Sequence, residues 1–107
     1  NVTVTESNVT YINGEIKGTG SVVTVNSSFT ADESVGTYLC DTSAADMNIS
    51  LPATATIGKV WNFKKIAIDK GIRINSASLI DGEANLFIDA LNNSYSIQFD
   101  GITYKII

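Results

Sequence analysis

Acidic residues that lie close together in the sequence are the first candidates for chemistry. An enzyme that hydrolyses glycans needs two carboxyl groups, one protonated as the acid and one ionised as nucleophile or base. Three pairs lie close enough in the chain: Asp32 with Glu33, Asp41 with Asp46, and Asp81 with Glu83. Each pair lies in a predicted turn, where turn chemistry alone accounts for aspartate. We therefore expect a non-enzymatic protein with no catalytic residues, and a glycan hydrolase or lyase is the alternative.

Histidine and cysteine limit the remaining chemistry. The chain has no histidine, which excludes Ser-His and Cys-His nucleophile pairs and the usual histidine-bearing zinc sites. Cys40 is the single cysteine, so it forms no intrachain disulfide and is expected to act as a small buried hydrophobe. No acidic loop has the spacing of an EF-hand. We expect no metal site and no cofactor.

Aromatic side chains are candidates for contact with sugars, because an amphipathic ring can stack on the apolar face of a pyranose. Trp61 is one candidate, but it lies beside Phe63 in the most enclosed predicted strand, so core packing is the favoured interpretation. The same two interpretations apply to Tyr38, Tyr95 and Tyr104, whose hydroxyl groups could reach a groove between subunits. Burial of the tyrosine rings is again favoured.

Basic residues are concentrated in one stretch of the chain. Five of the seven positive charges lie between positions 59 and 73, at Lys59, Lys64, Lys65, Lys70 and Arg73. These side chains could bind an acidic capsule or a lipopolysaccharide phosphate. The favoured alternative is a solvated strand pair, or lysines that protect an exposed sheet edge. The resulting candidate ligand-binding residues are Trp61, Tyr38, Lys64, Lys65 and Arg73.

Composition predicts an all-β protein. Val, Ile, Thr, Tyr and Phe are abundant, Ser, Asn and Gly fill the gaps between them, and only 17% of the 107 residues are charged. The net charge of −4 would repel a nucleic-acid backbone, so no nucleic-acid partner is expected. No run approaches the roughly 20 apolar residues of a membrane helix, so membrane insertion is not expected either.

The end of the chain shows the clearest structural signal. Asp100-Gly101 separates two alternating runs, 95–99 and 102–106, and a two-residue Asp-Gly loop is a strong hairpin signal. This loop predicts that Phe99 pairs with Ile102, with the apolar residues of both runs on one face. The hairpin would form half of an antiparallel core.

Several other stretches are predicted strands, among them the short runs 72–74 and 86–88. The runs 35–41 and 47–51 are expected to be consecutive antiparallel strands, the second ending at Pro52. In the stretch 59–69 the alternation breaks near Lys64, which predicts a β-bulge or a strand covered on both faces. Asn13-Gly14 is a predicted turn. Residues 1–28 are predicted as a separate β segment, either the end of a shaft or an ordinary edge strand, and residues 29–107 as the main domain.

The order of features from Val35 to Ile107 resembles the C-terminal tip region of bacteriophage tail fibres and tailspikes. The matching pieces, in order, are Tyr38-Leu39-Cys40-Asp41-Thr42, Ile49-Ser50-Leu51-Pro52-Ala53, Gly58-Lys59, Phe63-Lys64-Lys65-Ile66, Ile80-Asp81-Gly82 and Phe99-Asp100-Gly101. Each piece is common by itself, and the combination of order and spacing carries the resemblance. Two departures are Tyr104, where the family often has Trp, and residues 1–28, which fit the pattern poorly.

The resemblance implies an antiparallel β-sandwich-like tip domain that is part of a homotrimer at the distal end of a fibre. Such domains bind host surface polysaccharide or lipopolysaccharide, or they register the trimer that carries them. The resemblance thus places the protein in the virion, at the phage tail, and outside the host cell during attachment. A monomeric β-sandwich from an extracellular adhesin is the second alternative.

Overall fold

The computed structural model describes residues 11–12, 15–16 and 21–107, and every regular element in these ranges is a β-strand. This confirms the all-β prediction. No helix in the described ranges could span a bilayer. The strands are β1 (Tyr11–Ile12), β2 (Glu15–Ile16), β3 (Val22–Val25), β4 (Phe29–Thr30), β5 (Thr37–Cys40), β6 (Met47–Ser50), β7 (Val60–Lys65), β8 (Ile72–Ile80), β9 (Glu83–Ile88), β10 (Ser94–Phe99) and β11 (Tyr104–Ile106).

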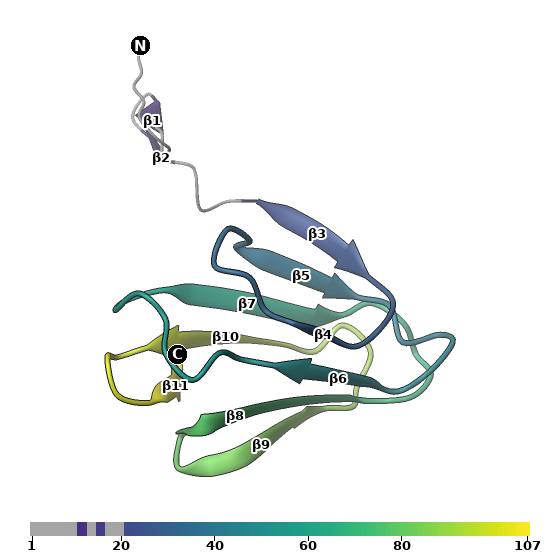
Figure 1. The fold of residues 1–107 in the computed structure, drawn as a ribbon. Helices are drawn as coiled ribbons and strands as arrows, with labels where there is room; N and C mark the ends of the chain where they lie inside the picture. The colour runs from purple at the N-terminus through teal and green to yellow at the C-terminus, as the bar shows by residue number, and fades with distance from the viewer. Residues whose placement is uncertain (1–10, 13–14, 17–20) are drawn as a thin grey trace.

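One mixed sheet curls into a half-barrel with two walls (Figure 1). The first wall contains β3, β5, β7 and β10 in that order, and the second contains β4, β6, β8 and β9. β11 joins the walls, because it pairs with β10 on one side and with β8 on the other. β3 and β4 are the two ends of this strand order, and β9, which pairs only with β8 in the described residues, is a further edge.

The sheet differs from the predicted antiparallel sandwich because the chain crosses between the walls after nearly every strand. Strands that follow one another on the same wall therefore run in the same direction. β3, β5 and β7 are parallel neighbours, as are β4, β6 and β8. Antiparallel pairing occurs where the chain turns back, as between β8 and β9 or β10 and β11.

The prediction that the runs 35–41 and 47–51 pair with each other is wrong. They form β5 and β6, which lie on opposite walls. The connecting segment 41–46 crosses between the walls and is held there by side chains. Asp41 Oδ1 accepts hydrogen bonds from the amide and hydroxyl of Ser43, and the buried Thr42 hydroxyl donates to the carbonyl of Asp69.

The terminal hairpin exists, but its predicted register is wrong by two residues. Phe99 pairs with Tyr104 rather than Ile102, and the loop covers residues 100–103. The cause is the Asp100 side chain, whose Oδ1 accepts the amide hydrogens of Ile102 and Thr103 at 2.8 Å and so stabilises the longer loop. Because the shift is an even number of residues, the inward face of the hairpin is preserved, although Ile102 becomes 80% exposed.

Alternation on each wall builds the core. On β7, Trp61, Phe63 and Lys65 face inward. The break in alternation near Lys64 reflects neither a bulge nor a strand covered on both faces, because β7 ends at Lys65 and Ile66 and the exposed Ile68 follow it in a loop. The buried apolar side chains are Ala31, Tyr38, Cys40, Met47, Ile49, Leu51, Trp61, Phe63, Ile72, Ile74, Ile80, Ile88, Ile97, Phe99 and Tyr104.

The predicted division into residues 1–28 and 29–107 stays a prediction. β3 and β4 lie on either side of this boundary, and both belong to the curled sheet. Most of residues 1–20, including the predicted Asn13-Gly14 turn, lie outside the described residues, and in that segment only the antiparallel pair β1–β2 is described.

Candidate ligand-binding groove

A row of three side chains crosses the outer face of the second wall. Asn48 on β6 is the strand partner of Arg73 on β8, and Arg73 is the strand partner of Phe87 on β9. Strand alternation explains the row, since Arg73 lies between the buried Ile72 and Ile74 and must point away from the core. The row therefore combines an amide, a guanidinium and an aromatic ring on one rigid surface.

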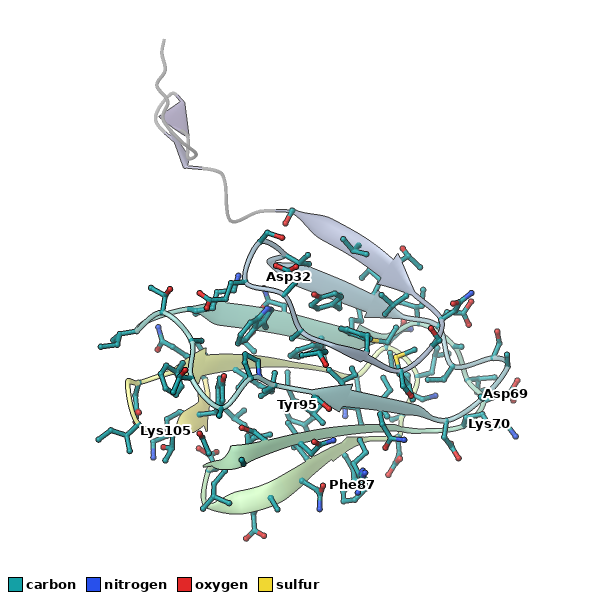
Figure 2. All side chains as sticks on the ribbon, in the orientation of Figure 1. Asp32, Asp69, Lys70, Phe87, Tyr95 and Lys105 are labelled. Carbon is teal, nitrogen blue, oxygen red and sulfur yellow. The ribbon has the colours of Figure 1, made fainter. Side chains whose placement is uncertain are left out.

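The row lies in a groove of about 350 Å³ between β6, β8 and β9. Phe87, near the end of β9, is 57% exposed, whereas phenylalanine side chains are more often buried (Figure 2, where Phe87 is labelled on β9). The groove is lined by Asp46, Met47, Asn48, Gly71, Ile72, Arg73, Phe87 and Asp89.

Hydrogen bonds fix the polar side of the groove. Arg73 Nε donates to Asn48 Oδ1 at 3.0 Å, which holds the guanidinium across the strand pair. The two terminal nitrogens of the guanidinium carry further N–H donors. Asp46 Oδ1 accepts the amide hydrogen of Gly71 at 2.8 Å. The carboxylate of Asp46 and the guanidinium of Arg73 are thus positioned by the protein before any ligand binds.

Gly71 allows a second carboxylate to approach the same point. A Cβ atom at Gly71 would lie 2.7 Å from Asp89 Oδ1 and 4.0 Å from Asp46 Oδ1. Two carboxylates from different strand ends therefore flank a backbone position that has no side chain. Any larger residue at position 71 would displace the Asp89 carboxylate.

This arrangement suits a polyhydroxylated ligand better than an apolar one. The Phe87 ring offers a flat apolar surface, on which the C–H face of a sugar ring can stack. The carboxylates accept hydrogen bonds from hydroxyl groups, and the Arg73 guanidinium donates them. An exposed aromatic ring beside convergent polar groups is typical of a small-ligand site.

Two candidates from the sequence, Trp61 and Tyr38, lie in the core, as the favoured interpretation predicted. Trp61 is fully buried, and its Nε1 donates to the carbonyl of Asp32 at 3.0 Å. The Tyr38 ring is 3% exposed and stacks on Phe63, with ring centroids 5.6 Å apart. Neither ring is accessible to a ligand in this structure.

The predicted basic cluster is divided among different surroundings. Lys65 is fully buried, and its Nζ donates to the carbonyl of Ala67, so it faces the interior rather than solvent. Lys59 Nζ donates to the carbonyl of Val35 and lies 5.3 Å from the Trp61 ring centre. Lys64 is on the outer face of the first wall, and Arg73 is on the outer face of the second. Of the predicted ligand-binding residues, only Arg73 lies in the groove.

In two of the three acidic pairs, one carboxyl group has a pKa below its ordinary value. Hydrogen bonds from Ser34 lower the pKa of Asp32, and hydrogen bonds from Ser43 lower the pKa of Asp41. A general acid requires the opposite direction of change. The described residues contain no group of three or more His, Cys, Asp and Glu side chains that could hold a metal ion.

Sequence reasoning missed Phe87, Asn48 and Asp89. Phe87 was grouped with Leu86 and Ile88 as a short apolar strand, although strict alternation would have placed the middle residue of such a run on the opposite face. Arg73 between two isoleucines was the clearest signal of an outward row. The strand pairing that places Asn48 and Phe87 on either side of it is not local in sequence.

No protein-family model matches the sequence, and no curated protein matches it.

Proposed function

We propose that this protein is a non-enzymatic attachment domain that binds a host surface glycan in the groove between β6, β8 and β9. The observation that carries the proposal is the row of Asn48, Arg73 and the exposed Phe87 beside two carboxylates. The ring is 57% exposed and lies in the groove beside convergent polar groups, as aromatic rings do in small-ligand sites. Stacking on a sugar gives it a role.

The wider setting of the proposal is the tip of a phage tail fibre or tailspike. The ordered resemblance from Val35 to Ile107 supports this setting, and so does the all-β fold. In this setting the domain belongs to the virion, acts outside the host cell and works as a homotrimer of sandwich-like units. Its ligand is host surface polysaccharide or lipopolysaccharide.

Replacing the exposed ring tests the proposal. In Phe87→Ala, the loss of a stacking contact worth about 1 kcal/mol should weaken binding of host polysaccharide roughly fivefold. Isothermal titration with polysaccharide purified from the host measures this change. Ile68→Ala is the matched control, because Ile68 is 74% exposed but lies outside the groove lining.

The outcomes separate the proposal from its rivals. Unchanged affinity in Phe87→Ala, or an equal loss in Ile68→Ala, would contradict binding in this groove. Shortening of the polysaccharide during incubation would favour a hydrolase or lyase, and Asp46→Asn and Asp89→Asn should then abolish the shortening. A monomer that binds glycan would favour the adhesin-type domain.

A further inference from the structure

Within the described residues, β3, β4 and β9 each have a partner on one side only, and the first two come from one uncharged part of the chain. Residues 18–31 contain no Asp, Glu, Lys or Arg and no proline, and β3 and β4 both lie within this segment. Edge strands of soluble monomers are usually protected by charged residues, proline or a bulge, because an open edge pairs readily with another strand. None of these protections occurs on β3 or β4.

The backbone of β3 has one used edge and one open edge. The carbonyls of Ser21 and Val25 accept hydrogen bonds from Thr37 and Asp41, so residues 21, 23 and 25 direct their backbone groups toward β5. Backbone direction alternates along a strand, and the N–H and C=O groups of Val22 and Thr24 therefore point away from β5. Within the described residues, β5 is the only strand that pairs with β3.

The side chains of β3 are also exposed on both faces. Val22 is 59% exposed on the outer face, and Val23 is 37% exposed on the inner face next to Tyr38. A central strand such as β7 instead buries its inner-facing residues, here Trp61 and Phe63. β3 thus has the apolar residues of a central strand in the position of an edge strand.

We propose that the open edge of β3 is the contact through which copies of this chain assemble, with each copy adding an edge strand to the sheet of the next. The occupant is a second copy of the chain. Each copy has a net charge of −4, so two copies repel each other over most of their surfaces. In the segment 18–31, which has no charged residue, two copies can meet without bringing like charges together. This inference rests on the homotrimer of the proposed function and names its contact surface.

A ring of three copies needs two different edges in each contact, because a cyclic contact is heterologous. β4 is the other end of the same sheet and is equally uncharged. The ring centroids of Phe29 on β4 and Tyr38 on β5 are 4.4 Å apart, so β4 packs against the strand that pairs with β3. β3 of one copy therefore pairs with β4 of its neighbour.

A proline at an outward-facing position tests the proposal without breaking the β3–β5 ladder. Thr24→Pro removes the open amide that a second copy would use and places the proline ring at the contact. Light scattering of the full chain at micromolar concentration should give about three times 11.4 kDa for the unaltered protein and 11.4 kDa for Thr24→Pro. Thr24→Val keeps the amide and should keep the trimer mass.

A second variant and a measurement of folding distinguish loss of the contact from misfolding. Val22→Lys places a charge at the edge and should also give the monomer mass, while circular dichroism reports whether each variant keeps its strands. A trimer that persists in folded Thr24→Pro and Val22→Lys would overturn the proposed contact, and so would an unaltered protein of 11.4 kDa.

Glycan titration distinguishes this inference from the proposed function. Monomeric Thr24→Pro should bind a short host oligosaccharide within about twofold of the unaltered affinity per site, since the groove lies on the other wall. Loss of binding in Phe87→Ala with an unchanged trimer mass supports both statements. Glycan binding by an unaltered monomer would remove the contact and leave the groove.

Discussion

At the scale of single residues, hydrogen-bonded carboxylates hold the loops together. Asp100 accepts two amide hydrogens in the last loop, and Asp32 and Asp41 accept comparable bonds from Ser34 and Ser43. These bonds favour the ionised form, and they are the main cause that lowers the pKa of each group below its ordinary value of 3.8. The loops therefore depend on negative charge, not only on geometry.

This dependence predicts how stability changes with pH. A carboxyl group whose pKa is lower in the folded state contributes stability above the unfolded pKa and loses it as pH falls through the folded value. The midpoint of thermal unfolding should therefore fall as the solution is taken from pH 5 to about pH 2. Circular dichroism at each pH measures the midpoint.

A triple variant isolates the contribution of these carboxylates. Asp32→Asn, Asp41→Asn and Asp100→Asn together keep a side-chain acceptor in each turn and remove its titration. The triple variant should be less stable at pH 7 and should lose less stability on acidification than the unaltered protein. Equal losses in both proteins would show that other groups control the acid sensitivity.

At the scale of elements, the terminal hairpin shows how one side chain decides a register. The Asp100-Gly101 pair alone predicts a two-residue loop, but capping of the amides of Ile102 and Thr103 favours the longer one. Ile102 then lies in solvent, while Ile97 on β10 is fully buried. Ile97 should therefore contribute strongly to the free energy of unfolding, and Ile102 should contribute little.

Substitution of each isoleucine tests the register. Ile102→Asn should change the free energy of unfolding by less than about 0.5 kcal/mol, because the side chain already lies in water. Ile97→Ala should cost about 2–5 kcal/mol through lost burial and a new cavity. Denaturant unfolding measures both values. A loss above about 2 kcal/mol in Ile102→Asn would instead support the two-residue loop, with Ile102 packed against Phe99.

The same scale shows what the sequence could and could not predict. The inward residues of β6, with Met47, Ile49 and then Leu51 alternating toward Pro52, follow from a period of two, which is local and visible in the chain. The partner of each strand was not visible, because crossings between the walls place strands together that are far apart in sequence. Arg73 was predicted as a ligand contact from its charge, whereas Phe87 needed the pairing of β8 with β9.

At the scale of the whole molecule, the two walls have different outer faces. On the outer face of the first wall, Asn62 of β7 donates to Thr37 of β5 and accepts from Ser96 of β10. The second wall presents the exposed ring of Phe87 beside the Arg73 guanidinium, whose terminal nitrogens have further donors. The first face thus has a row of polar side chains that bond to one another, and the second combines an exposed aromatic ring with a guanidinium.

This difference suggests separate surfaces for the two proposed functions, glycan binding and assembly. Glycan binding is assigned to the outer face of the second wall, and assembly is assigned to the open ends β3 and β4. The two proposed functions use different strands, so a variant designed to test one leaves the residues of the other in place. Fully buried residues such as Trp61 hold the walls together and belong to neither surface.

The most direct test of the central claim is the site at which host glycan contacts the folded protein. Nuclear magnetic resonance of the isotope-labelled chain, titrated with a short host oligosaccharide, reports each backbone amide separately. We expect the largest shifts at Asn48, Arg73, Phe87 and Asp89, with the amides of Thr37, Asn62 and Ser96 on the first wall unchanged. Shifts confined to the first wall, or no shifts at millimolar oligosaccharide, would contradict a glycan site between β6, β8 and β9.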